Sequence, residues 1–204
     1  ETSEEVLLHP CDLSNDDDIR NLKLDIKNKW GNVDIIIHSA AFAPRELLNG
    51  DYVDNITRDG FQIAHDISSY SFAALAKEFR DIISPCGSML TLTYLGSERV
   101  IKNYNVMGLA KASLEANVRY MSHSLGSNNI RVNAVSAGPI KTLAAAGISG
   151  FNEILKHVED KAALKRSITL EEVANTALFL ASDQSSGITG QVIYVDGGFN
   201  ISGV

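Results

Sequence analysis

The chain of 204 residues has few cysteines and no long hydrophobic run, and each shortage excludes a class of protein. Its two cysteines, Cys11 and Cys86, form no C-x-x-C pair, and its five histidines show no ligand spacing, which argues against a disulfide framework and a metal site. No apolar run is long enough to cross a bilayer and no secretory signal is recognisable, so we expect a cytoplasmic protein without a membrane partner. The formal net charge of −7 argues against nucleic acid as a partner.

The sequence also lacks a glycine-rich phosphate loop of the G-x-G-x-x-G type, although its overall pattern is that of a dinucleotide-binding fold. Strand patterns at 5–13, 33–38, 88–95, 130–139 and 191–198 alternate with helical patterns at 15–30, 61–83, 105–125 and 169–182. This alternation predicts an α/β fold with a doubly wound parallel sheet, Rossmann-like in type. The first strand pattern ends like the third strand of such a fold, so we expect that the N-terminal βαβ unit, with its phosphate loop, is missing from this sequence.

Candidate functional residues follow several of the predicted strands, at the edge of the sheet where doubly wound folds bind ligands. They are Asp12, the small-residue patch SAAFAP at 39–44, Tyr94, and the turn Gly138-Pro139-Ile140. We interpret 1–204 as a single domain, in which the connection 140–168 holds short helices at 142–147 and 151–161 and forms a lid. The run VDIIIH at 33–38 predicts a strand that is covered on both faces.

Tyr104 and Lys111 are seven positions apart, which is close to two helical turns, so they share one face if both are helical. A phenol beside an ammonium can hold a proton donor next to developing negative charge. A buried tyrosine and a surface lysine without a joint task would give the same spacing. Similarly, Asp12 could simply cap the following helix, the small residues could serve packing, and 142–160 could be an ordinary helical hairpin.

The run LTLTYLGSERVIKNYNVMGLAKASLEANVRYM resembles the bacterial NADH-dependent enoyl-acyl-carrier-protein reductases, a divergent branch of the short-chain dehydrogenase/reductase superfamily. Supporting stretches are HSAAFAP, GDYVDNITRDGF, IAHDISSYSFAALAK, RVNAVSAGPIKTLAAAGI and VIYVDGGFNI, so the resemblance covers essentially the whole chain. Common members of the superfamily have Y-x-x-x-K, whereas this branch has Y-x6-K. Here Met107 stands where the common motif has tyrosine, and Tyr104 lies one turn earlier. Ala41 stands where the branch usually has glycine.

The resemblance implies a role for each matching residue. Tyr104 would hydrogen-bond the thioester carbonyl and stabilise the enolate, Tyr94 would be a second active-site tyrosine, and Lys111 would bind the nicotinamide ribose. The other implied cofactor contacts are Asp12, Leu13, Ser39, Ala40, Ile140, Lys141, Thr142, Leu143 and Ala144. The implied substrate contacts are Ala43, Met107 and Phe151 together with the two tyrosines, with a substrate-binding flap at about 142–160.

The function implied by the resemblance is that of an enoyl-[acyl-carrier-protein] reductase of type II fatty acid biosynthesis, which transfers hydride from NADH to the β-carbon of a trans-2-enoyl thioester. NADH/NAD is then the cofactor, an acyl carrier protein bearing the enoyl thioester is the partner, and a homotetramer is expected. The basic residues Lys141, Lys161, Lys165 and Arg166 are candidates for docking the acidic carrier, or are merely solvated charges. Two alternatives remain: a ketone or alcohol dehydrogenase, disfavoured by Met107, and a non-catalytic dinucleotide-binding protein, which would need neither tyrosine.

Overall fold

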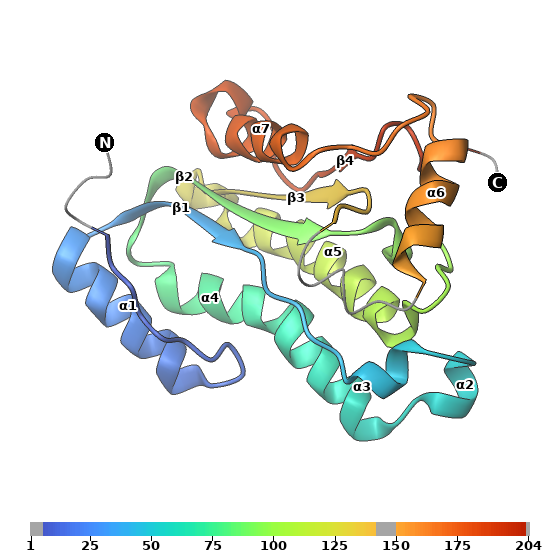
Figure 1. Cartoon of the computed structure of the whole chain (residues 1–204). Helices are drawn as coiled ribbons and strands as arrows, with labels where there is room; N and C mark the ends of the chain where they lie inside the picture. The colour runs from blue at the N-terminus through green and yellow to red at the C-terminus, as the bar shows by residue number, and fades with distance from the viewer. Residues whose placement is uncertain (1–5, 142–149, 203–204) are drawn as a thin grey trace.

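A four-stranded parallel sheet forms the centre of the molecule, as Figure 1 shows. The computed structural model describes residues 6–141 and 150–202. The strands are β1 (Val33–His38), β2 (Ile83–Thr93), β3 (Arg131–Ala137) and β4 (Val192–Val195), and they lie side by side in that order. All three pairings are parallel, and helices α1, α4 and α5 lie against one face while α7 covers part of the other. The predicted doubly wound α/β fold is therefore confirmed.

Four of the predicted helices form close to their expected bounds: α1 (Asp16–Trp30), α5 (Asn105–Leu125), α6 (Phe151–Lys161) and α7 (Leu170–Ala181). The Asn15 side chain caps α1, three aspartates follow in its first turn, where the positive end of the helix dipole stabilises carboxylates, and Gly31 ends it at φ 81°. Short turns complete this part of the fold: η3 (Leu95–Ser97), η4 (Gly126–Asn128) and η6 (Asp183–Ser185).

The single helix predicted over 61–83 is wrong at both ends. The segment consists of α3 (Arg58–His65), a π-helical turn η2 (Asp66–Tyr70) and α4 (Ser71–Phe79), preceded by η1 (Arg45–Leu48) and α2 (Tyr52–Asn55). Helix α3 begins earlier than predicted because the Thr57 side chain accepts a hydrogen bond from Gly60 N. The helical segment ends earlier than predicted, at Phe79 of α4, because Ile83 pairs with Val33 as the first residue of β2.

The strand predicted at 5–13 is also wrong over residues 6–13, which the structure describes as irregular chain. This segment is tied to α1: Lys29 Nζ donates to the Val6 carbonyl at 3.2 Å, and His9 Nδ1 lies 2.7 Å from Asp25 Oδ2. A strand needs a neighbour to satisfy its backbone groups, and β1, at the edge of the described sheet, pairs only with β2. The prediction that the strand at 33–38 is covered on both faces is wrong, because Ile36 packs against the core whereas Ile35 and Ile37 on the other face are exposed.

The core lies on both faces of the central strands β2 and β3. On one face, Phe72 of α4 and Leu114 of α5 pack with Met89 and Val132. On the other, Leu180 of α7 packs with Leu90 and Val135. Arg131 at the start of β3 fixes α7 in place, because its guanidinium donates to the carbonyls of Leu180, Ala181 and Ser182 where the helix ends. This packing holds the carboxyl ends of β2 and β3 next to the amino end of α5.

Candidate active site

Two tyrosines meet where β2 ends and α5 begins. Tyr94 follows the last residue of β2, and Tyr104 is the N-cap residue of α5. Their ring centroids are 5.1 Å apart and the rings stand nearly perpendicular, an edge-to-face contact that fixes both. Gly96 makes this arrangement possible, since a Cβ at that position would lie 2.3 Å from Cδ1 of Tyr104.

A cavity of about 390 Å³ opens beside the two phenols. This volume lies in the range of sites for small organic molecules, and its walls are mostly apolar. Met107 of α5 and Phe151 of α6 face it, so the two helices form opposite walls. The remaining lining residues come mainly from the loops that follow β1 and β3, among them Ala41, Phe42, Ala43, Gly138, Pro139 and Ile140.

Both phenols are held in the protonated form at neutral pH. Burial raises the pKa of Tyr94 to about 12, and the Asp196 carboxylate adds to the effect. Burial raises the pKa of Tyr104 still further, with smaller contributions from Tyr94 and Glu115. Each hydroxyl can therefore donate a hydrogen bond to an oxygen in the cavity that gains negative charge.

Lys111 of α5 lies inside the protein and is not among the residues that line this cavity. Its side chain is buried, and Nζ donates to the carbonyl of Leu92 at 2.7 Å. Burial lowers its pKa to about 8, against an opposing effect of Glu115, so the ammonium remains mostly protonated at pH 7. An ammonium has three donors, and within the described residues one of them is used, which leaves two for the hydroxyls of a ligand.

His38, the last residue of β1, anchors the loop that leads into the cavity. Its ring is buried between Thr91 Oγ1, 3.0 Å from Nδ1, and Ser71 Oγ, 2.8 Å from Nε2. The Ser71 hydroxyl donates to the carbonyl of Ile67, so its oxygen accepts from Nε2–H. The Thr91 hydroxyl lies within reach of both Nδ1, at 3.0 Å, and the His38 carbonyl, at 3.2 Å, so its one proton is placed between two acceptors. Burial, followed by the charge of Lys111, lowers the pKa of His38 to about 4, so the ring is neutral.

Six of the residues predicted for the site line this cavity: Ala43, Tyr94, Tyr104, Met107, Ile140 and Phe151. Ser39 and Ala40 precede its wall without lining it, and Lys141 is exposed beyond it. Thr142, Leu143 and Ala144, with the helix predicted at 142–147, lie outside the described residues.

Asp12 and Leu13 are not among the residues that line the cavity. The Asp12 carboxylate accepts from the backbone N–H and the hydroxyl of Ser14 at 2.9 and 2.7 Å, while Leu13 packs against the core. The alternative that Asp12 caps the following helix does not hold, because Asn15 is the N-cap residue of α1.

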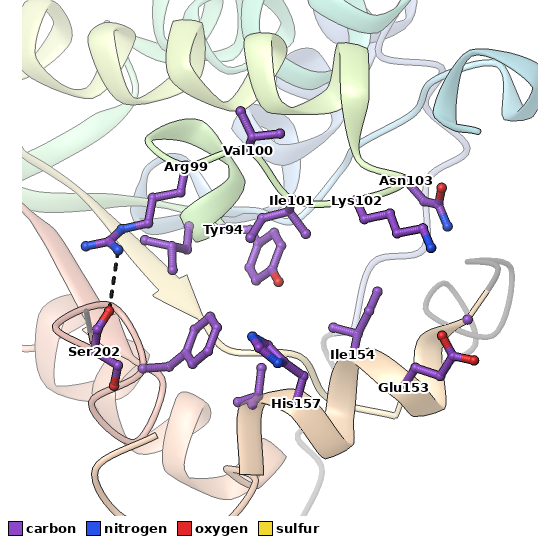
Figure 2. Close-up of a pocket in the computed structure, with 14 residues that line it drawn as sticks. Tyr94, Arg99, Val100, Ile101, Lys102, Asn103, Glu153, Ile154, His157 and Ser202 are labelled. Atoms are coloured by element: carbon purple, nitrogen blue, oxygen red, sulfur yellow. Dashed lines mark hydrogen bonds between the residues drawn. The ribbon is translucent and has the colours of Figure 1, made fainter. Parts of the chain in front are cut away.

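A second cavity of about 550 Å³, shown in Figure 2, lies beyond Tyr94 between the segment 99–103 and helix α6. It shares five lining residues with the first cavity, so this part of the wall is common to both: Tyr94, Ile101, Lys102, Asn103 and Ile154. Sequence reasoning missed Ile101 and Ile154, because they reach the site only through the packing of α6 against this segment.

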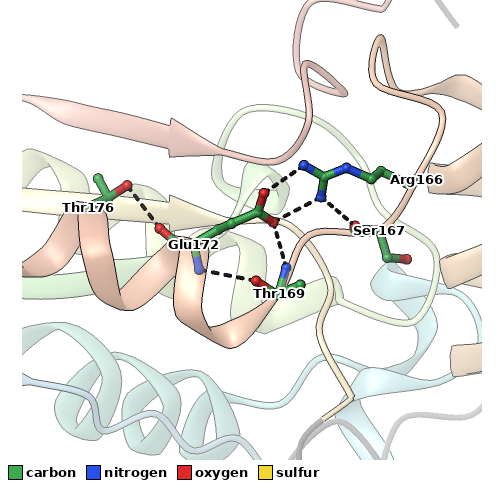
Figure 3. A network of polar contacts seen from close by, with 5 residues as sticks. All are labelled: Arg166, Ser167, Thr169, Glu172 and Thr176. Carbon is green, nitrogen blue, oxygen red and sulfur yellow. Dashed lines mark hydrogen bonds and ion pairs between the residues drawn. The ribbon is translucent and has the colours of Figure 1, made fainter.

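The structure shows contacts within the chain for some of the basic residues that are candidates for docking the carrier. Figure 3 shows Arg166 in a two-pronged ion pair with Glu172, whose oxygens lie 2.6 and 3.0 Å from the guanidinium nitrogens. This contact and the hydrogen bond from Thr169 N lower the pKa of Glu172 to about 2. Glu172 is also the acidic residue of the capping box at the start of α7. Lys165 Nζ donates to the carbonyl of Asp160. Two of the four basic residues thus have partners within the chain.

Neither a metal site nor a membrane-spanning helix occurs in the described ranges. No group of three or more histidine, cysteine or acidic side chains there could hold a metal ion. None of the helices at 6–141 and 150–202 is both long and apolar enough to cross a bilayer.

Comparison with known proteins adds the family to this geometry. A family model described as enoyl-(acyl carrier protein) reductase matches residues 1–200. The enoyl-[acyl-carrier-protein] reductase [NADH] FabI of Salmonella typhimurium is 54% identical over 193 residues, which are 95% of this chain and 74% of that protein. The enzyme of the same description from Bacillus cereus is 50% identical over 200 residues, 98% of this chain and 78% of the relative.

Solved structures agree with this similarity. The Bacillus cereus enoyl-acyl carrier protein reductase, crystallised with NADP+ and indole naphthyridinone, superimposes with a TM-score of 0.96 at 49% identity, covering 100% of this chain and 79% of that one. The NADH enzyme from Aquifex aeolicus gives a TM-score of 0.91 at 47% identity, over 95% of this chain and 76% of that one. The chain belongs to the enoyl-(acyl carrier protein) reductase family.

Proposed function

We propose that this chain carries the catalytic centre of an NADH-dependent enoyl-[acyl-carrier-protein] reductase, which reduces the double bond of a trans-2-enoyl thioester. One observation supports this most directly: two protonated phenols meet at an apolar cavity, and the helix that begins at Tyr104 carries a buried, protonated lysine seven positions on. Such a set of donors suits a reaction that places negative charge on an oxygen and needs a cofactor held in a fixed position.

The buried lysine fits a nicotinamide cofactor through its unused donors. Within the part of the chain that the structure describes, Lys111 Nζ donates to one carbonyl, which leaves two N–H groups for the vicinal hydroxyls of a ribose. Doubly wound folds bind dinucleotides at the carboxyl ends of their strands. Three of the predicted cofactor contacts lie there: Ser39 and Ala40 after β1, and Ile140 after β3. When bound there, NADH supplies the hydride.

The phenols act on the substrate. As the β-carbon is reduced, the charge of the conjugated system moves to the thioester oxygen, and the Tyr104 hydroxyl donates a hydrogen bond to that oxygen. Because the site is buried, this hydrogen bond is strongest at the moment when the charge is largest. Tyr94 keeps the Tyr104 ring in place through their edge-to-face contact and offers a second hydroxyl at the cavity.

The test is loss of NADH absorbance with a crotonyl thioester, measured on the full-length protein. Tyr104→Phe should lower kcat about 10²–10³-fold, the usual effect of removing one donor to an oxyanion. Lys111→Ala should mainly weaken NADH binding, seen as a raised KM for NADH. Tyr120→Phe, a change at an exposed tyrosine of α5, is the matched control. Wild-type kinetics in both Tyr104→Phe and Lys111→Ala would refute the assignment, and oxidation of simple alcohols without enoyl reduction would favour a ketone or alcohol dehydrogenase.

The same function requires a carrier-bound substrate and a wall that can admit it. We propose that 1–204 is a single domain in which 142–160 forms a substrate flap, and the position of Phe151 at the cavity supports the flap. We also propose that Lys141 and Lys161 contribute to docking an acidic acyl carrier protein. We also propose a homotetramer, because Leu178, Phe179 and Ile201 expose large apolar side chains. A cytoplasmic location is proposed as well, in keeping with the free thiols of Cys11 and Cys86. Light scattering of the purified protein tests the assembly.

A further inference from the structure

A buried carboxylate lies one helical turn from Lys111. Glu115 follows Lys111 by four positions on α5, and both side chains are buried, with exposures of 5% and 6%. Burying a charged group is costly unless other groups compensate for the lost water, so the position of Glu115 needs an explanation. The reaction described above gives this carboxylate no direct part.

The two charged groups form hydrogen bonds with consecutive residues of β2. Lys111 Nζ donates to the carbonyl of Leu92 at 2.7 Å, and the Thr93 hydroxyl donates to Glu115 Oε1 at 2.6 Å. The next residue of the chain is Tyr94. Glu115 is thus fixed by its own partner and acts on the ammonium through the low-dielectric interior, without direct contact.

Other charged and titratable groups face this pair from the surrounding elements. They are His38 on β1, Tyr94 after β2, Tyr104 at the start of α5, Glu98 after η3, Tyr194 on β4, and Asp196 after β4. His38 is neutral, and the three phenols are protonated at neutral pH. The Asp196 carboxylate is already occupied by the backbone N–H groups of Gly198, Phe199 and Asn200. Among the charged groups named here, only Glu115 directly raises the pKa of Lys111.

We infer that Glu115, held by Thr93, is the internal counter-charge that keeps Lys111 protonated, and that it is therefore a positioning residue for the cofactor. The part of this inference that concerns the cofactor depends on the function proposed above; the coupling between the two side chains does not. Without the carboxylate, the buried ammonium would lose its proton closer to neutral pH, and a neutral amine would bind the ribose without positive charge.

The experiment is a pH titration of the Lys111 side chain by NMR in the full-length apo protein, with lysine labelled at the side-chain nitrogen or Cε. Glu115→Gln keeps the shape and the acceptor for Thr93 while removing the charge. The Lys111 titration should move about one unit to lower pH, as expected for loss of a nearby opposite charge. In Glu115→Asp, which keeps the charge, Lys111 should titrate close to its wild-type pH, and Glu171→Gln on the exposed start of α7 should leave the titration unchanged. An unchanged titration in Glu115→Gln, or an equal shift in Glu115→Asp, would overturn the inference.

Two further measurements keep the test decisive. If Glu115→Gln folds poorly, its urea unfolding is compared with that of the double variant Glu115→Gln/Lys111→Met. The double variant should be more stable, because it no longer buries an unpaired ammonium. Absence of this rescue would count against the coupling. NADH affinity should fall with rising pH near 8 in the wild type and at a lower pH in Glu115→Gln. A shifted Lys111 titration in a protein that neither binds NADH nor reduces enoyl thioesters would leave the coupling in place and refute the proposed function.

Discussion

His38 should make the stability of this protein depend on pH in a way that can be calculated. Burial, with a smaller effect from Lys111, holds its pKa at about 4 in the folded protein, against 6.5 for an ordinary histidine. Because the unfolded chain binds the proton more tightly, acid favours unfolding. The stability that this group confers is fully present above pH 6.5 and is lost as the pH falls towards 4. The loss amounts to about 2 kcal/mol at pH 5 and about 3 kcal/mol at pH 4.

The assay is urea unfolding of the wild type and of His38→Gln at pH 7 and pH 5. Glutamine keeps a donor for the Ser71 oxygen but does not titrate, so the wild type should lose about 2 kcal/mol more than the variant over this interval. His123→Gln, which removes an exposed histidine, should behave like the wild type. Equal losses in wild type and His38→Gln would refute the reasoning, as would an NMR titration of the His38 ring with a midpoint near 6 in the native protein.

Two other substitutions test the packing that places the site. Gly96→Ala should lower kcat at least about ten-fold while the protein stays folded. The new Cβ would lie 2.3 Å from Cδ1 of Tyr104, so the ring would have to move. Gly187→Ala, at a position where nothing lies within 4 Å of the added Cβ, is the control in the same NADH assay. Arg131→Met should destabilise the protein by about 2–3 kcal/mol in urea unfolding, since the last carbonyls of α7 lose their charged donor. A stability loss below about 0.5 kcal/mol would show that water replaces the guanidinium there.

The sequence predicts the elements whose ends are set by neighbouring residues. Three aspartates after Asn15 and a glycine at 31 mark both ends of α1, and the Thr169/Glu172 pair marks the start of α7. The spacing of Tyr104 and Lys111 predicts that one helix carries both, and in the structure Lys111 lies on α5 while Tyr104 is its N-cap residue. These signals act within a few residues, so no tertiary information is needed to read them.

The second cavity and the polar contacts of the interior could not be predicted in this way. Glu115 lies on the same stripe of α5 as Leu114 and Val118, and a carboxylate on an apolar stripe indicates a buried charge. Its partner Thr93, however, is 22 positions away and meets it only because β2 packs on α5. The His38 contacts with Ser71 and Thr91 join three elements and depend on the register of β1 with β2.

The failed predictions at 5–13 and 61–83 have a common physical cause. Hydrophobic periodicity reports which side chains are buried, whereas a strand also requires a second backbone to accept its hydrogen bonds. Cys11 and Leu13 are partly buried against the core, as the pattern indicates, but no strand of the described sheet lies beyond β1 to pair with their backbone. Ile83 shows the converse: its apolar side chain continues the helical pattern, yet its backbone pairs with Val33 of β1, so it belongs to β2. The assignment of Asp12 and Leu13 to the cofactor comes from the family resemblance and not from this strand, so it stays a prediction.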